Sequence, residues 1–76
     1  MANELDIVAL KGARPDLGLG KGERGTVVFV HPNAACEVEF ADADGQTRVL
    51  QAFPDDELEV VWHARDVAPE PRRAAR

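Results

Sequence analysis

The chain has few of the groups that hold very small proteins together covalently or through a metal. Its 76 residues include one cysteine, Cys36, no serine and no tyrosine. One thiol excludes an intramolecular disulfide and a four-cysteine zinc site. The lack of serine excludes a serine nucleophile. A chain of this length therefore depends for its stability on an apolar core or on contact with another subunit.

Long apolar runs and an excess of basic charge are also missing. No stretch approaches the ~18 apolar residues of a membrane span. The opening MANELDIVAL lacks the basic start of a signal peptide. We therefore expect a cytoplasmic protein with no membrane partner. The net charge of −5 and the pI of about 4.8 argue against the broad cationic surface that nucleic-acid binding needs.

Short runs rich in β-branched and aromatic residues fill most of the chain, and turn residues separate them. The pattern predicts strands over residues 5–10, 26–30, 36–40, 47–53 and 58–62. We expect a long loop over 11–25, a hairpin at Asp44-Gly45 and one helical turn over 54–57. This layout predicts an all-β fold: a small five-stranded SH3-like barrel over residues 1–63, with one short helical turn before the last strand. Residues 64–76 are predicted to form a flexible tail.

Three of the predicted strands carry apolar residues on both faces. In LDIVAL, Val8 and Leu10 lie opposite Ile7. In TVVFV, strict alternation puts Val27 and Phe29 on one face and the other three residues on the opposite face. In LEVVW, the same alternation puts Trp62 on the face of Leu58 and Val60. A small barrel has only one interior. The surplus apolar residues therefore either lie under the long loop and the tail or form a patch for another subunit, and we favour self-association.

The stretch GKGERGTVV contains a G-x-G-x-x-G pattern at Gly20, Gly22 and Gly25. In dinucleotide-binding folds this pattern follows a strand and opens a helix. Here it precedes a strand, and Gly22 stands where a P-loop needs Ser or Thr. We therefore interpret the glycines structurally. Gly20 and Gly22 are expected to adopt positive φ, and Gly25 to allow a close approach where the strand starts.

The residues that could carry chemistry are few. Cys36 and His31 lie across a predicted turn, and with His63 they offer three metal-ligand types. A cysteine at the start of a strand is usually structural, and the spacing of the three residues matches no zinc motif. We expect no catalytic site, no metal and no cofactor.

The segment KGERGTVVFV resembles the KOW-type motif of ribosomal and transcription-factor barrels. It has four basic neighbours that could form a local rim: Lys11, Arg14, Lys21 and Arg24. Contact with RNA is therefore an alternative, although the acidic body of the chain counts against it.

Several motifs together resemble a family of small bacterial domains of unknown function with an SH3-like barrel. They are DIVAL, PDLGL, GERGTVV, EVEF and DGQT, and the resemblance covers residues 4–62. It implies a barrel in a bacterial cytoplasmic setting without a catalytic motif. It assigns no functional residue.

The pattern favours a non-enzymatic module that acts through protein–protein contacts, as an accessory subunit or a homo-oligomer. Alternatives are an RNA- or ribosome-associated barrel and an antitoxin- or immunity-like protein that neutralises a basic partner. Glu37 and Glu39 project from one face of their strand as a candidate acidic strip. The candidate partner-binding residues are Arg14, Asp16, Leu17, Leu19, Lys21, Val27, Phe29, Glu37 and Glu39.

Overall fold

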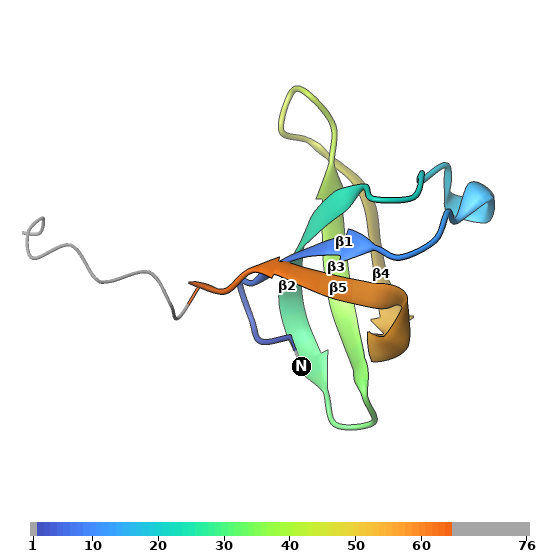
Figure 1. Cartoon of the computed structure of the whole chain (residues 1–76). Helices are drawn as coiled ribbons and strands as arrows, with labels where there is room; N and C mark the ends of the chain where they lie inside the picture. Colours follow the sequence, from blue (N-terminus) through green and yellow to red (C-terminus); the bar gives the residue numbers. More distant parts are fainter. Residues whose placement is uncertain (1, 65–76) are drawn as a thin grey trace, which may run out of the picture.

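The computed structural model describes residues 2–64, which form one curled antiparallel sheet (Figure 1). Its elements in chain order are β1 (Ile7–Leu10), η1 (Pro15–Leu17), β2 (Arg24–His31), β3 (Ala35–Ala41), β4 (Thr47–Pro54), η2 (Asp55–Glu57) and β5 (Leu58–Trp62). Both η elements are single 3-10 turns. The predicted all-β fold of five strands, with one helical turn before the last, is confirmed.

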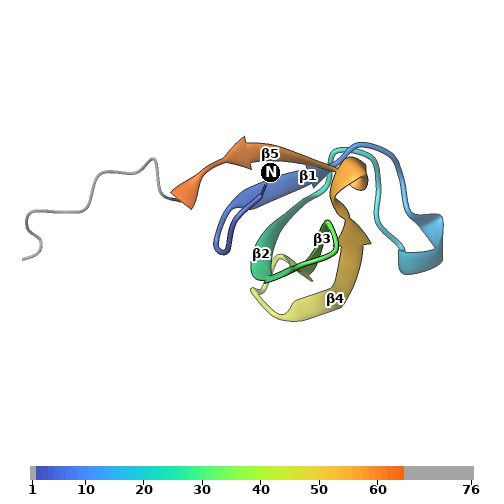
Figure 2. The same ribbon diagram turned by 90° about the horizontal axis from the view of Figure 1, so that it is seen from below.

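The strands lie in the spatial order β4-β3-β2-β1-β5. β2, β3 and β4 form an antiparallel meander, and η2 returns β5 to the side of β1. Figure 2 shows how the sheet curls round its interior. Within residues 2–64, however, no hydrogen-bonded ladder joins β4 to β5. The expected closure, which would remove both edges, is therefore not made, and two strands keep a free edge.

The inner face of the sheet holds the core. Val8, Val27, Val38, Phe40 and Phe53 are fully buried in it. The two phenylalanine rings meet edge to face, with centroids 5.5 Å apart. This arrangement is one of the two that aromatic pairs prefer.

Three β-bulges interrupt the regular alternation, each by one extra residue: Val28 in β2, Arg48 in β4 and Val61 in β5. A bulge shifts the side chains that follow it to the opposite face. Phe29 therefore does not join buried Val27 but is 50% exposed. The prediction that these two residues share a face is wrong for this reason.

The same correction applies to β5. Leu58 is buried and Val60 is half-buried, but Trp62 beyond the bulge is 46% exposed. The prediction that these three residues share a face fails because Val61 has no partner in β1.

The glycines of the G-x-G-x-x-G pattern serve the fold in two different ways. Gly22 has φ +82, as predicted, whereas Gly20 has no positive φ, which corrects the prediction for that position. Gly25 lies near the start of β2, beside its neighbouring strand β3. A Cβ at Gly25 would approach the Glu39 carbonyl oxygen to 2.8 Å and the Val38 side chain to 2.7 Å. The predicted close approach at the strand start is confirmed.

Gly25→Ala is expected to lower the free energy of unfolding by about 2–3 kcal/mol, because backbone and core atoms must move to admit a methyl group. The matched control is Gly20→Ala, where a Cβ would meet nothing within 4 Å. Urea unfolding of both variants measures the difference. A Gly25→Ala protein as stable as the control would contradict the close approach.

Candidate functional site

Arg14 fastens the long loop between β1 and β2 to the rest of the domain. Its Nη1 donates to Glu57 at 3.0 Å, and its Nε and Nη2 donate to Asp16 at 3.1 and 3.0 Å. The guanidinium lies 5.3 Å from the centroid of the Phe53 ring, a cation–π geometry. These hydrogen bonds also lower the pKa of the Asp16 carboxyl. Arg14 therefore joins the loop to η2 and to the core.

The other loop candidates divide between the core and the solvent. Leu19 is buried in the core and Leu17 packs against it, whereas Asp16 and Lys21 are exposed. Val27, predicted on β2, is fully buried. The structure thus places Leu19 and Val27, two of the predicted partner-binding residues, in the core. The loop turns back at the Arg14–Leu19 bridge, and this turn brings Leu19 over the core.

The outer face of the sheet collects the remaining candidates. Residues directly opposite each other in neighbouring strands share a face. The first row across this face is Trp62, Ile7, Thr26, Glu39 and Leu50. The second row is Phe29, Glu37 and Ala52. The register therefore brings predicted Phe29, Glu37 and Glu39 together. Leu50 lies directly opposite Glu39, whereas Trp62 lies at the other end of the first row, on β5.

Large apolar side chains are exposed on this face. Phe29, Leu50 and Trp62 are 50%, 56% and 46% exposed. Leu5 and Val28 are exposed beside them, and the Leu5 N–H donates to the Val27 carbonyl at 2.7 Å. We call these five residues the outer patch; it follows the curl of the sheet from Leu50 at the β4 edge to Trp62 at the β5 edge (Figure 2). Single exposed apolar residues are ordinary, but several on one face are typical of a contact surface.

Leu5 is strained as well as exposed. Its φ is +71, in the left-handed region, and 62% of its surface faces solvent. A residue with a Cβ loses roughly 1–2 kcal/mol there, and packing in the domain does little to offset it. Exposed residues in this conformation are concentrated at binding sites.

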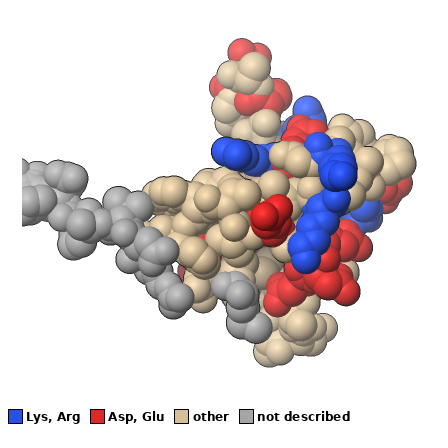
Figure 3. Space-filling model, viewed as in Figure 1, with Lys and Arg blue, Asp and Glu red and all other residues tan. Residues whose placement is uncertain are grey.

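Charge is distributed unevenly over the face of the molecule on which β5 lies (Figure 3). Figure 3 shows Lys, Arg, Asp and Glu gathered beside the long loop and η2, whereas the surface over β5 is mostly uncharged. Within the outer face, Glu37 Oε1 lies 2.8 Å from His31 Nε2, and Glu39 accepts a hydrogen bond from Thr47. The two carboxylates therefore border the apolar residues as a half-buried acidic strip.

The chemistry-bearing residues are kept apart. Cys36 is buried, and its Sγ donates to Asp55 Oδ1 at 3.2 Å rather than to a histidine. Burial and the Asp55 carboxylate raise the pKa of the thiol to about 11. Within residues 2–64, no three His, Cys, Asp or Glu side chains gather to hold a metal ion. No helix in this part of the chain is long and apolar enough to cross a membrane.

Asp6 is a buried acid that the sequence analysis missed. Its Oδ2 accepts the Asn3 N–H at 2.8 Å and the His63 Nδ1 at 3.1 Å, and its Oδ1 accepts the Ala64 N–H at 2.9 Å. Burial alone would raise the pKa of this carboxyl, but these donors outweigh it and lower the pKa. Asp6 alternates in phase with buried Val8, and this phase was the available signal for an inward carboxylate.

Comparison with known proteins gives a family and no activity. A family model described as a domain of unknown function, DUF4926, matches residues 4–60. The chain belongs to the DUF4926 family. No curated protein and no solved structure matches the sequence. Asp6, the outer patch and all five strands lie within the matched segment or directly beside its end.

Asp6→Asn is expected to lower the free energy of unfolding of the DUF4926 domain by about 2–4 kcal/mol at pH 7, because an amide cannot accept all three donors. Since the pKa of Asp6 is lowered by folding, its contribution is complete above its ordinary pKa of 3.8 and is lost as the pH falls through the folded value. Urea titrations from pH 7 to pH 2 should therefore show the two proteins converging below about pH 4.

The control for this series is Asp44→Asn, an exposed position in the β3–β4 turn, which should change stability by less than about 0.5 kcal/mol. A constant gap between wild type and Asp6→Asn over the whole pH range would show that the carboxylate is not the stabilising form.

Cys36 in the folded domain is expected to react with iodoacetamide at pH 8 at least about 100-fold more slowly than in urea, because the thiolate is rare and the sulfur is buried. Mass spectrometry of timed samples measures this ratio. Equal rates in the two conditions would indicate an accessible, activated thiol.

Proposed function

We propose that the DUF4926 domain is a non-catalytic module that binds another protein subunit through its outer patch. The observation that carries the proposal is the pair of bulges at Val28 and Val61. Regular alternation would place Phe29 and Trp62 on the buried face, and the bulges turn both aromatic rings toward solvent. Bulges that re-aim side chains are typical of functional sites.

The composition of the patch also supports a protein partner. Aromatic side chains are enriched at the centres of protein interfaces, and a polar rim surrounds them. Here Glu37 and Glu39 border the aromatic residues, so the complementary surface would be apolar with basic groups at its margin. The strand order, with η2 before β5, further supports an SH3-like barrel, a scaffold used for many binding tasks.

Phe29→Glu tests the proposal directly. The tagged domain is captured from its native cells, and the eluate is analysed by mass spectrometry and light scattering. We expect wild type to be recovered with a stoichiometric protein partner or as a defined oligomer, and Phe29→Glu to lose that contact by at least about tenfold while remaining folded. Two results together would contradict the proposal: the wild type is monomeric at high concentration, and every protein that it captures is also captured by Phe29→Glu.

Leu5→Asn separates binding from folding. Asparagine tolerates the left-handed region, so this variant should gain about 0.5–1 kcal/mol of stability while losing affinity for the partner. The matched control is Ala34→Gly, which relieves a φ of +63 in the β2–β3 turn. It should gain similar stability and leave affinity unchanged. Unchanged affinity in Leu5→Asn would remove Leu5 from the contact surface.

A further inference from the structure

Among the residues that the structure describes, the outer edge of β5 pairs with no other strand. Lys11 N–H donates to the Glu57 carbonyl at 2.9 Å, and the register pairs Ala9 with Glu59. Because the backbone groups of alternate residues point to opposite sides of a strand, Leu58 and Val60 direct theirs away from β1. The Leu58 N–H bonds to the Asp55 carbonyl. The Val60 N–H and carbonyl and the Leu58 carbonyl therefore face the free edge.

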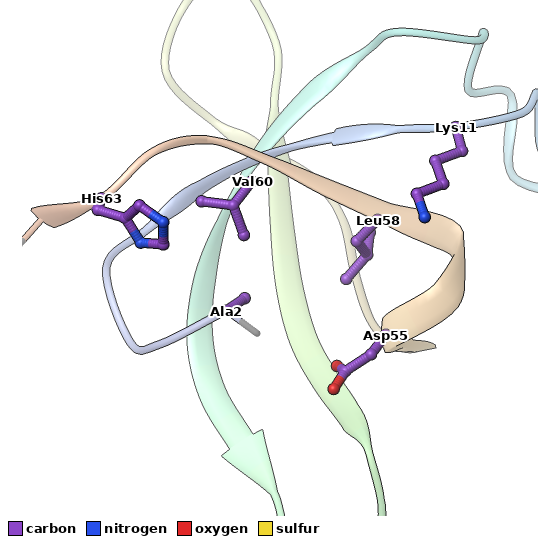
Figure 4. A pocket seen from close by; sticks show the side chains of 6 residues that line it. All are labelled: Ala2, Lys11, Asp55, Leu58, Val60 and His63. Atoms are coloured by element: carbon purple, nitrogen blue, oxygen red, sulfur yellow. The ribbon is translucent and has the colours of Figure 1, made fainter.

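A pocket of about 460 Å³ lies beside this edge (Figure 4). Its lining residues are Ala2, Lys11, Asp55, Leu58, Val60 and His63. Figure 4 shows the Leu58 and Val60 side chains extending from β5 into the space, with Lys11 and His63 toward opposite ends. The site therefore combines an apolar centre, a cation at one end and backbone hydrogen-bonding groups along one wall.

We propose that the free edge of β5 binds an extended peptide segment of a partner protein, which adds a short sixth strand to the sheet. One apolar side chain of the segment lies against Leu58 and Val60, and a carboxylate lies beside Lys11. The inference rests on the proposed protein-binding function but uses a different surface from the outer patch. In this mode, main-chain hydrogen bonds supply affinity and a side-chain pocket supplies specificity.

Three observations favour a peptide strand as the occupant. The Val60 N–H and carbonyl form a donor–acceptor pair that matches one residue of an added strand. The apolar centre is placed for a side chain of that strand, since Leu58 and Val60 lie two residues apart and share a face. Among described residues Lys11 makes no ion pair, so its ammonium is available to a carboxylate.

The charge around the pocket fixes the orientation of the carboxylate. Asp55 lies toward the same end as Lys11 (Figure 4), but its Oδ1 already accepts the Cys36 thiol, and its negative charge directs an incoming carboxylate toward the Lys11 ammonium. His63 at the other end is held by Asp6. Lys11 is thus the one lysine or arginine among the lining residues within 2–64, and the carboxylate is either the C-terminus of the segment or an acidic side chain.

The experiment selects from displayed random octapeptides with free carboxyl termini on the immobilised full-length chain. Selected peptides are synthesised with free and amidated C-termini, and their affinities are measured by fluorescence polarisation. Val60→Pro should weaken binding by at least about tenfold, because proline removes the edge donor. The variant should still fold, since the Val60 N–H makes no bond within the sheet. Lys11→Gln should weaken binding severalfold, and Arg48→Gln, which removes an exposed positive charge outside the pocket, should not.

Amide hydrogen exchange gives a readout that does not depend on the proline variant folding. The Val60 amide should exchange fast in the free domain and at least about tenfold more slowly with peptide bound, while the Glu59 amide is protected in both states. A loss of affinity on amidation assigns the carboxylate to the peptide C-terminus. No loss on amidation, with loss in Lys11→Gln, assigns it to an acidic side chain.

The inference is overturned if no peptide is selected, or if selected peptides leave Val60 exchange unchanged and bind Val60→Pro as tightly as wild type. Peptides lost in Phe29→Glu but retained by Val60→Pro would overturn it and support the outer patch as the binding surface. Self-association abolished by Val60→Pro and unaffected by peptide would overturn it in favour of a second copy at the edge.

Discussion

The structure depends on the buried carboxylate of Asp6. Three donors from segments far apart in the chain converge on its oxygens: the backbone before β1, and His63 and Ala64 after β5. The backbone carbonyl of the same residue accepts the Val27 N–H from β2. Within residues 2–64 no ladder closes the sheet, and one cysteine allows no disulfide, so Asp6 ties the sheet at the point where its first and last strands meet. Removal of any of the three donors would leave part of a buried charge unpaired, which costs more than the net value of the bond.

The second constraint is the size of the domain. A five-stranded sheet of this length has room for one layer of large side chains on its inner face, and Phe40 and Phe53 already occupy much of it. The bulges at Val28 and Val61 keep two more aromatic rings out of that space. They also increase the local twist, which lets the short strands curl round the core. The exposed aromatic residues are thus a consequence of the same irregularities that shape the sheet.

The sequence was sufficient for the elements of the fold and insufficient for the faces of the strands. Strand positions, the Asp44-Gly45 hairpin and the η2 turn follow from local preferences that operate over a few residues. Bulges depend on the register between strands, so the exposure of Phe29 and Trp62 could not be read from alternation. The sequence predicted only part of the candidate site. It pointed to Phe29, Glu37 and Glu39, but Leu50 and Trp62 reach the same outer face through pairing with other strands, which the sequence does not show. Asp6 was missed because the residues around a single acid in an apolar run do not show which hydrogen-bond donors the fold will bring to it.

The buried carboxylate and the two candidate binding surfaces are physically connected. Asp6 directly follows strained Leu5, and its partner His63 directly follows Trp62. The hydrogen bonds of Asp6 therefore fix the backbone beside these two residues of the outer patch. His63 also lines the pocket beside the β5 edge. Any partner that binds the folded domain at either surface stabilises the hydrogen bonds of Asp6 by mass action, because these bonds and both surfaces exist only in the folded state. The backbone strain at Leu5 lowers the stability of the free domain. A contact made by the exposed Leu5 side chain would offset this loss in the complex.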